Sequence, residues 1–273
     1  MTIFVSGATG NVGRPLVEEL LAAGHQVRAL TRNPAKANLP AGVEVVAGNL
    51  DNTDSLAGVF TGVTAAHLIS FGDNYVPLFN GEEIMALVKQ AGVRKVTVLR
   101  GDVEPSALDA AVAAADLDHT YLGPVEFMSN TLEWAESISK DGLVREGFSG
   151  VKSAVVHDAD IASVAAAVLT SDGHTGKEYW LTGPAALTPP EKVRIIAEVL
   201  GREIGYVDLT EAEVIEQWRA QGYSAEDIGF FLGMRQNPPE LGATVQPTVE
   251  QVTGQPGRTF AQWVRENAAA FGG

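Results

Sequence analysis

The chain has 273 residues, enough for one large α/β domain or for a nucleotide-binding domain with a smaller second lobe. It carries 34 acidic and 19 basic residues, a formal charge of −15 at pH 7, which repels polyanions and argues against binding nucleic acid or an anionic membrane. Cysteine is absent, which excludes disulfides, thiolate catalysis and cysteine-based metal sites. A first strand from residue 2 or 3 leaves no room for a signal peptide, and no apolar stretch is long enough to span a bilayer, so we expect a soluble, cytoplasmic protein.

The chain opens with an apolar strand, a glycine-rich turn and an amphipathic helix. Gly7 permits a tight turn, Gly10 lets backbone N–H groups approach a pyrophosphate, and Gly13 lets the helix pack close to the strand. The helix N-terminus adds positive partial charge. An ordinary glycine-rich turn is the alternative, but the strand–turn–helix context favours dinucleotide binding. The cofactor contacts predicted in this turn are Gly7, Thr9, Gly10, Asn11, Val12 and Gly13.

Strands and helices alternate through the first half of the chain, which predicts a Rossmann fold with a doubly wound parallel sheet. The expected strands are 2–6, 26–31, 43–47, 65–70, 95–99 and 119–122. The expected helices are 13–23, 53–60, 80–91, 105–115 and 158–169. After about residue 173 the pattern changes to a short strand near 179–182 and helices near 188–200, 210–220, 224–235 and 258–270.

This change of pattern predicts two parts. Residues 1–172 are expected to form the NAD(P)-binding Rossmann domain, and residues 173–273 a smaller, mostly helical C-terminal substrate lobe. Ligands of this fold lie beyond the carboxyl ends of the strands, so residues 123–150 are expected to contribute to the pocket cover. The apolar run at 230–234 is compatible with a pocket lid, a dimer surface or simple core.

The end of the second strand indicates which dinucleotide is bound. An NAD-preferring site usually has an acidic residue there, and this chain has none. Arg32 stands in that place and suits a 2′-phosphate, with Arg14 and Lys36 adding positive charge. A solvated loop charge is the alternative for Arg32. We expect NADP(H) to be preferred over NAD(H).

Two further segments are expected along the cofactor groove. Asn49 can donate to and accept from adenine, and Leu50 can pack on its ring. Equally, Asn49 and Asp51 can simply shape the turn and cap the next helix. Phe71, just after the fourth strand, is expected to line the groove.

Taken together, these motifs give the chain a family resemblance. It resembles the NmrA-like group of atypical short-chain dehydrogenases/reductases, through the order and spacing of segments rather than any one of them. The matching segments are 7–13, 27–34, 48–51, 118–122, 127–130, 158–162 and 181–184, with a tail around Phe260 and Trp263 that also fits. The resemblance implies a Rossmann fold and NAD(P)H binding. It also implies either reduction of quinones, azo compounds and related electrophiles, or redox reporting to a protein partner without turnover.

The catalytic Tyr/Lys pair of typical short-chain dehydrogenases is absent. Four residues beyond the five tyrosines stand Phe79, Val125, Gly183, Thr210 and Asp227, none of them lysine. The serine expected at the end of the fifth strand is missing too, since that strand runs into Arg100, Gly101 and Asp102. Reduction of an unactivated ketone needs a positioned proton donor, worth about a hundred- to ten-thousand-fold in rate. An activated acceptor can take its proton from water, so no catalytic residue is assigned.

Substitute acids and pocket residues are weaker candidates. His119 and Tyr121 should share one face of the sixth strand, but a buried tyrosine is more often core than catalyst. His67 and His157 read as structural residues. The substrate-pocket candidates are Arg100, Asp102, Phe127 and Met128; the first two can also form a plain ion pair, and the last two can be core. No spacing of histidines and carboxylates predicts a metal site.

Two functions remain open at this point. The first is an NADPH-dependent oxidoreductase acting on a small, apolar, activated acceptor such as a quinone, azo or conjugated compound. The second is a catalytically silent NADP(H)-binding redox sensor that acts through a protein partner. The missing Tyr, Lys and Ser favour the sensor, whereas the apolar second lobe favours the reductase, which is preferred. A nucleotide-sugar epimerase is a poor third, and a homodimer is compatible with either reading.

Overall fold

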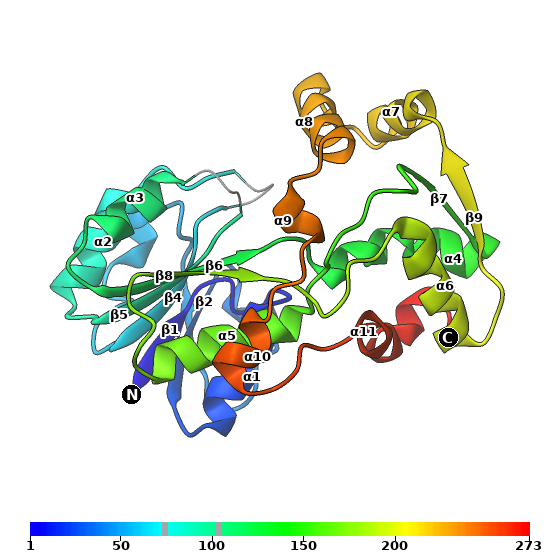
Figure 1. Ribbon diagram of the computed structural model, residues 1–273. Helices are drawn as coiled ribbons and strands as arrows, with labels where there is room; N and C mark the ends of the chain where they lie inside the picture. The colour runs from blue at the N-terminus through cyan, green and yellow to red at the C-terminus, as the bar shows by residue number, and fades with distance from the viewer. Residues whose placement is uncertain (73–75, 102–104) are drawn as a thin grey trace. The chain divides into compact units, whose positions relative to one another are not determined.

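The computed structural model describes residues 1–72, 76–101 and 105–273, and a parallel sheet forms the core of the first of its two compact units (Figure 1). The sheet has seven strands in the order β3-β2-β1-β4-β5-β6-β8, and every neighbouring pair is parallel. The strands are β1 (Thr2–Val5), β2 (Gln26–Thr31), β3 (Glu44–Ala47), β4 (Ala65–Ile69), β5 (Lys95–Leu99), β6 (Asp118–Pro124) and β8 (Lys177–Leu181). The expected Rossmann fold is confirmed.

Helices cover both faces of this sheet (Figure 1). One face carries α1 (Gly13–Ala22), α5 (Asp158–Thr170) and α10 (Thr248–Thr253), with α5 packed between the other two. The other carries α2 (Gly81–Gln90) and α3 (Ala107–Ala113), which pack side by side. The core beneath α2 and α3 includes Phe4, Leu68, Val96, Ile84 and Leu108, all fully buried. Buried strands flanked by helices explain why these strands read as continuous apolar runs.

One expected helix is wrong. Residues 53–60 were expected to be helical, but only the short 3-10 turn η2 (Thr53–Leu56) forms there. Ala57 has already left the helical conformation, with φ −57° and ψ 119°, and Gly58 adopts a left-handed conformation with φ +74°. Gly58 therefore redirects the chain before a full helix can form. A second 3-10 turn, η1 (Pro34–Lys36), follows β2.

The remaining elements form a second compact unit with its own core. They are η4 (Met128–Trp134), α4 (Ala135–Asp141), β7 (Leu143–Gly147), α6 (Pro189–Leu200), β9 (Gly205–Leu209), α7 (Glu211–Ala220), α8 (Ala225–Gln236), α9 (Glu240–Ala243), α11 (Phe260–Glu266) and η5 (Ala268–Phe271). Strands β7 and β9 pair in parallel as a small sheet. Met128, Ile138, Val193, Trp263 and Phe271 lie in the core of this unit.

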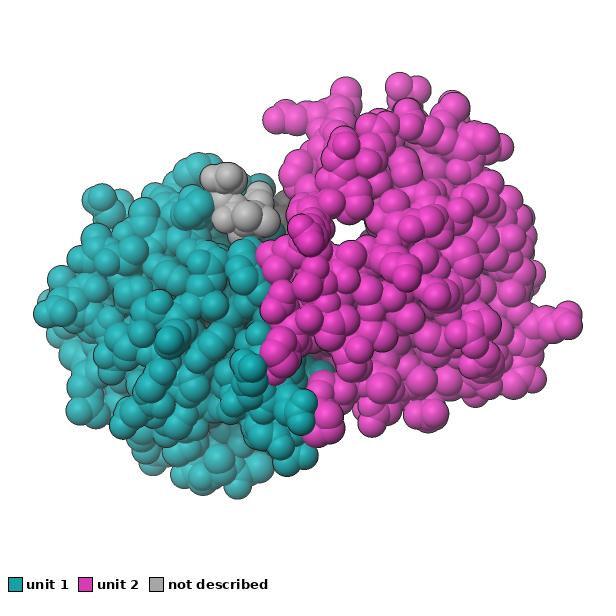
Figure 2. Space-filling model, viewed as in Figure 1, with its two compact units in different colours: residues 1–124, 158–181, 248–255 teal, residues 125–157, 182–247, 256–273 magenta. Residues whose placement is uncertain are grey.

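The two units interleave along the chain (Figure 2). The first consists of residues 1–124, 158–181 and 248–255, and the second of residues 125–157, 182–247 and 256–273. This differs from the consecutive division expected after residue 172, because β8 pairs with β6 in the main sheet. The chain leaves the first unit after β6, returns to it to form α5 and β8, and returns once more to form α10.

Several helices begin where short polar residues cap them. Thr188, Thr210 and Ser224 each accept a hydrogen bond from the backbone N–H three residues later, and the side chain there bonds back. These reciprocal capping boxes satisfy N–H groups that a helix start otherwise leaves unpaired. They set the starts of α6, α7 and α8 within one residue of the expected positions.

Candidate cofactor site

The glycine turn between β1 and α1 is held together by its own backbone. Gly7 adopts φ +58°, and a Cβ there would lie 2.3 Å from Cδ1 of Ile69. A Cβ on Gly13 would lie 2.1 Å from the Gly7 carbonyl oxygen and 2.8 Å from Cα of Ala8. At Gly13 the clash is with backbone atoms, so no side chain fits there. At Gly7 the clashing Ile69 methyl group could rotate away, and the positive φ is what favours glycine. Gly13 thus brings the start of α1 directly against the turn.

Gly10 has a different role from the other two glycines. Its N–H donates to the Gly7 carbonyl oxygen at 2.9 Å, and a Cβ there would contact only that oxygen, at 3.2 Å. The side of the turn formed by Thr9, Gly10 and Asn11 is exposed, whereas Val12 is buried. The first N–H groups of a helix lack intrahelical partners, so the start of α1 offers donors on this exposed side. Such a turn suits a phosphate or pyrophosphate.

Positive charge gathers at the end of β2. Arg32 is exposed directly after that strand, and Lys36 is exposed in η1. The guanidinium of Arg14, in the first turn of α1, donates to the carbonyl oxygens of Asn38 at 2.6 Å and Ala37 at 3.0 Å. Arg14 therefore fastens the segment that follows Arg32 to the helix of the glycine turn.

The turn after β3 is held by side chains that form hydrogen bonds within it. Asn49 N–H donates to the Ser55 hydroxyl at 2.9 Å, while Leu50 is buried in the core of the first unit. Asn80 donates from its amide to the Leu50 carbonyl oxygen and to the Thr53 hydroxyl, both at 2.8 Å. Leu50 was expected to pack on the adenine ring, but its side chain lies in the core instead. The hydrogen bond from Asn49 to Ser55 is compatible with the alternative in which Asn49 shapes the turn.

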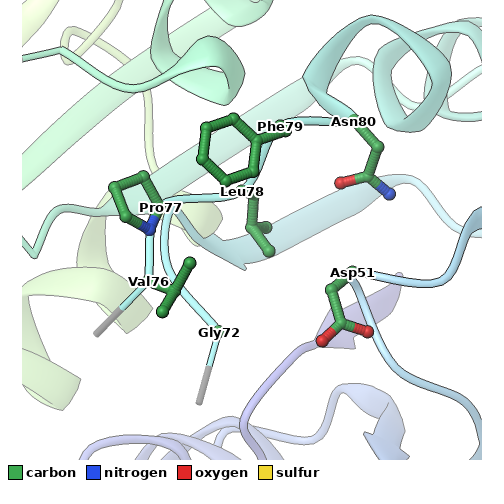
Figure 3. Close-up of a pocket in the computed structure, with 7 residues that line it drawn as sticks. All are labelled: Asp51, Gly72, Val76, Pro77, Leu78, Phe79 and Asn80. Carbon is green, nitrogen blue, oxygen red and sulfur yellow. The ribbon is translucent and has the colours of Figure 1, made fainter. Parts of the chain in front are cut away.

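A cavity of about 330 Å³ lies beside this turn (Figure 3). Its lining is Asp51, Gly72, Val76, Pro77, Leu78, Phe79 and Asn80. Asp51 and Asn80 project into it from the same side in Figure 3, whereas the Phe79 ring points away from them. A carboxylate and an amide in one cavity can together pair with a group that carries N–H donors and acceptors. Sequence reasoning treated Asp51 only as a turn residue, although it ends the same segment as Asn49.

Phe71 and Asp102 were the remaining predictions near the strand ends. Phe71 follows β4, and its ring packs on Gly101, where a Cβ would lie 2.5 Å from the ring. Gly72, beside it, lines the cavity. Phe71 thus lies at the carboxyl ends of β4 and β5, where a cofactor groove is expected. Asp102 lies outside the described residues.

Arg100 is tied into a buried charge network. Its Nε donates to Asp109 at 3.0 Å and its Nη1 to Glu178 at 2.6 Å. The guanidinium also lies 4.0 Å from the ring centre of Tyr121. The Asp109 side chain is 3% exposed and that of Arg100 is 9% exposed. This geometry matches the plain ion pair that the sequence left open, with Asp109 in place of Asp102.

The other candidate acids also have structural partners. Tyr121 donates to the Asp109 carbonyl oxygen at 2.9 Å, and burial together with the Asp109 carboxylate raises the pKa of Tyr121. His119 packs edge-on against Tyr121 with ring centres 5.4 Å apart, which confirms that the two share a face. His157 contacts Glu266 at 3.1 Å. His67 is fully buried, and burial lowers its pKa to about 4.

Comparison with known proteins identifies the family. Residues 7–105 match a family model described as NAD(P)H-binding. The chain is 34% identical to "(4-alkanoyl-5-oxo-2,5-dihydrofuran-3-yl)methyl phosphate reductase" of Streptomyces griseus, with 98% of this chain and 99% of that protein covered. It is 30% identical to an NAD(P)H azoreductase of Xenophilus azovorans, with 99% of both chains covered.

Solved structures share the fold. Quinone oxidoreductase QOR2 of Escherichia coli, in complex with NADPH, superposes with a TM-score of 0.80 at 24% identity, covering 97% of this chain and 99% of that one. NmrA, a negative transcriptional regulator solved with NADP, superposes with a TM-score of 0.71 at 19% identity, covering 97% and 94%. The chain belongs to the NmrA-like family of atypical short-chain dehydrogenases/reductases. It is an NAD(P)H-binding oxidoreductase related to azo and quinone reductases.

Within this NmrA-like chain, the predicted pocket residues of the second unit fall into two environments. Met128 is 1% exposed and belongs to the core, so it matches the structural alternative. Phe127 is half-buried and makes a backbone bridge to Val156. Next to it, Glu126 pairs with the buried Lys192 at 3.2 Å. Burial opposes ionisation of Glu126, but the Lys192 ammonium and the Ser153 hydroxyl hold the pKa of Glu126 below its usual value.

Neither a metal site nor a membrane-spanning helix is found among the residues that the structure describes. No group of three or more histidine, aspartate or glutamate side chains there has an arrangement that could hold a metal ion. No described helix is both long and apolar enough to cross a membrane.

Proposed function

We propose that the chain is an NADPH-dependent reductase that delivers hydride to a small, activated acceptor such as a quinone, an azo compound or a conjugated carbonyl compound. The observation that carries this proposal is the glycine turn. Gly7 and Gly13 lock its backbone, and Gly10 leaves its outer side open for a pyrophosphate. The bound nicotinamide cofactor would supply the hydride. The chain's own residues hold its phosphates and adenine.

The cofactor groove divides into three contacts under this proposal. The start of α1 holds the pyrophosphate through the N–H groups of Asn11, Val12 and Gly13. The cavity beside β3 accepts the adenine, with Asp51 accepting a hydrogen bond from its exocyclic amine. Phe71, at the ends of β4 and β5, packs beside the nicotinamide half.

The preference for NADPH rests on the charges after β2. Arg32 offers a bidentate partner for a 2′-phosphate, and no acidic residue stands between Arg32 and Lys36 to bind a free 2′-hydroxyl. Arg14 supports this assignment, because its two hydrogen bonds tie the 37–38 segment to α1. A 2′-phosphate bound here would meet positive charge from a loop that Arg14 already holds against α1.

The acceptor class follows from the chain's lack of a standard proton donor. None of the tyrosines has a lysine four residues later, and Tyr121 is committed to the Asp109 carbonyl oxygen. An acceptor whose added electrons are delocalised onto oxygen or nitrogen can take its proton from water. The Streptomyces griseus relative fits this description, because its named substrate carries alkanoyl and oxo groups on a dihydrofuran ring. Conjugated lactones therefore belong in the test panel beside quinones and azo dyes.

The test begins with cofactor titration of the purified protein. NADPH should bind at least about tenfold more tightly than NADH, and Arg32→Ala should weaken NADPH selectively. Lys177→Ala, an exposed lysine on β8, is the matched control and should change neither affinity. Equal affinity of the two cofactors, or an unchanged preference in Arg32→Ala, overturns the NADPH assignment.

Turnover is then measured by following NADPH oxidation with quinones, azo dyes and an acyl-substituted unsaturated lactone. Oxidation above the rate without acceptor on at least one class is the expected result. Tight NADPH binding with no turnover across the panel would contradict the reductase and favour a regulatory protein that only binds the cofactor.

A further inference from the structure

Strands β4 and β5 end side by side at the edge of the sheet where this fold binds its ligands. They pair in register up to Ile69 opposite Leu99, so Phe71 and Gly101 both follow at this edge. Typical short-chain dehydrogenases carry at the end of the fifth strand the serine that holds the substrate oxygen. The residues that stand there in this chain therefore bear on how it binds an acceptor.

Arg100, the first residue after β5, does not take over the role of that serine. Its guanidinium pairs with Asp109 at 3.0 Å and with Glu178 at 2.6 Å, and its side chain is only 9% exposed. The charge is thus neutralised within the first unit and is not offered to a ligand. The Arg100 N–H also donates to the Leu122 carbonyl oxygen at 2.9 Å, which extends the pairing of β5 with β6. Arg100 therefore fixes the end of β5 and leaves Gly101 at the edge.

The ring of Phe71 occupies the space that a side chain on Gly101 would need. A Cβ on Gly101 would lie 2.5 Å from Cδ1 of Phe71 and 3.0 Å from both Cγ and Cε1. Three neighbouring ring atoms come this close, so the ring covers the glycine. The φ of Gly101 is not in the left-handed region, so the backbone there would accept other residues. The contact with the ring is therefore the reason for glycine at this position.

The backbone on either side of the ring is fixed. Phe71 forms an antiparallel bridge with Pro77, and the Leu78 N–H donates to the Ser70 carbonyl oxygen at 3.0 Å. Leu78 is buried in the core of the first unit, so it anchors this segment there. Phe71 is half-buried, so part of its ring rests on Gly101 and part remains accessible at the edge. A fixed and accessible aromatic ring is suited to stacking against a flat ligand.

We propose that Phe71 determines which acceptors this chain reduces. Its ring, seated on Gly101, stacks against a flat conjugated acceptor at the edge where a typical short-chain dehydrogenase binds a substrate oxygen through serine. Gly101 is a positioning residue, because it leaves the space that the ring needs. This role rests on the proposed function, and it narrows the substrate class to acceptors with a flat conjugated ring system, such as naphthoquinones and aromatic azo compounds.

Stacking and hydride acceptance require the same property of the acceptor. The delocalisation that keeps a quinone or an aromatic azo compound flat also spreads the added electrons, so that the proton can come from water. An open-chain conjugated ketone accepts hydride by the same chemistry but offers little surface to an aromatic ring. These two kinds of acceptor therefore separate the contribution of the ring from that of the reaction.

The first test compares NADPH oxidation with 1,4-naphthoquinone and with an open-chain conjugated ketone. Phe71→Leu keeps an apolar side chain but removes the ring. It should raise the KM for naphthoquinone about three- to tenfold with little change in kcat, and change the KM for the ketone by less than about twofold. Phe71→Tyr keeps the ring and should retain the wild-type preference. The dissociation constant of NADPH, titrated without acceptor, should change by less than about twofold in both variants.

A double-mutant cycle tests whether Gly101 acts through the ring. Gly101→Ala alone should displace the ring and raise the KM for naphthoquinone as Phe71→Leu does. In the Phe71→Leu background it should add less than about twofold, because the ring that the Cβ displaces is gone. Gly150→Ala is the matched control and should change neither KM, because a Cβ there would meet open space. Independent, multiplying effects of the two substitutions would contradict the seating of the ring on Gly101.

The stacking role and the proposed function fail in different ways. If the wild type turns over both acceptors but Phe71→Leu lowers both rates equally, the ring does not select the acceptor, and the stacking role is overturned while the reductase stands. Loss of NADPH affinity in Phe71→Leu with an unchanged acceptor preference would place the ring against the nicotinamide alone and overturn it too. A wild type that oxidises NADPH with neither acceptor overturns the reductase, and the stacking role with it.

Discussion

Gly13 lies so close to the carbonyl oxygen of Gly7 that a Cβ would come within 2.1 Å of it. Gly10, by contrast, donates its N–H to the same oxygen, and a Cβ on Gly10 would meet only that oxygen, at 3.2 Å. The three glycines thus do two different jobs. Gly7 and Gly13 make the fold of the turn, whereas Gly10 keeps its outer face accessible.

These two jobs predict different results for alanine substitutions. Gly13→Ala forces helix and turn apart and should destabilise the protein by about 2 kcal/mol or more. Gly10→Ala should change the free energy of unfolding by less than about 1 kcal/mol but weaken NADPH binding at least about tenfold. Urea unfolding and cofactor titration measure the two effects. Gly229→Ala on α8 is the control, because a Cβ there would meet open space. Equal destabilisation by Gly10→Ala and Gly13→Ala would contradict the separate roles of these two glycines.

The cavity beside β3 gives a test of adenine binding. Asp51→Ala removes the one carboxylate in the described lining and should weaken NADPH and NADH alike, because both carry adenine. The expected loss is about tenfold, as for one charge-assisted hydrogen bond. Asp54→Ala, an exposed acid on η2, serves as the control. A change in NADPH affinity alone would connect Asp51 to the 2′-phosphate instead.

The Arg100 network predicts a large effect on stability. Arg100→Leu leaves the Asp109 carboxylate, 3% exposed, without its main cationic partner. Breaking a buried pair on one side costs about 3–5 kcal/mol. Glu178→Gln should cost much less, because the Glu178 side chain is 42% exposed. Denaturant unfolding separates the two, and similar losses in both variants would refute a network centred on Asp109.

His67 predicts a loss of stability in mild acid. Burial lowers its pKa from 6.5 to about 4, and its Nε2 has no hydrogen-bond partner among the described residues. Between pH 6.5 and about 4 the unfolded chain therefore binds a proton that the folded chain does not, so stability falls as the pH falls through this window. At full effect the shift corresponds to about 3 kcal/mol.

The matched variant is His67→Gln, which retains a side chain able to pair with Thr97, the present partner of Nδ1 at 2.8 Å. Carboxylates titrate in the same window, so the measured quantity is the difference between wild type and variant. The wild type should lose more stability than His67→Gln between pH 7 and pH 4.5. Parallel pH profiles of the two proteins would show that His67 does not carry this dependence.

Local features of the fold could be predicted because their causes are local. The apolar runs of β1, β4 and β5, the glycine turn and the capping residues act within a few neighbours, and their bounds agree with the structure to within about a turn. The shared face of His119 and Tyr121 followed from the two-residue period of a strand. Strands β7 and β9 were not expected, because each is stabilised by a partner about 60 residues away rather than by its own pattern.

The site shows the same division between local and long-range causes. Residue order within single segments was enough to indicate the dinucleotide turn, the arginine after β2 and the missing Tyr/Lys pair. Whether Leu50 and Met128 face a pocket or the core depended on what packs over them, since both roles require the same apolar side chain. Three features depend on segments that are far apart in the sequence. They are the pairing of Arg100 with Asp109, the cavity lined by Asp51 and Asn80, and the interleaving of the two units. Only the tertiary structure decided these features, because it is the folding of the whole chain that brings such segments together.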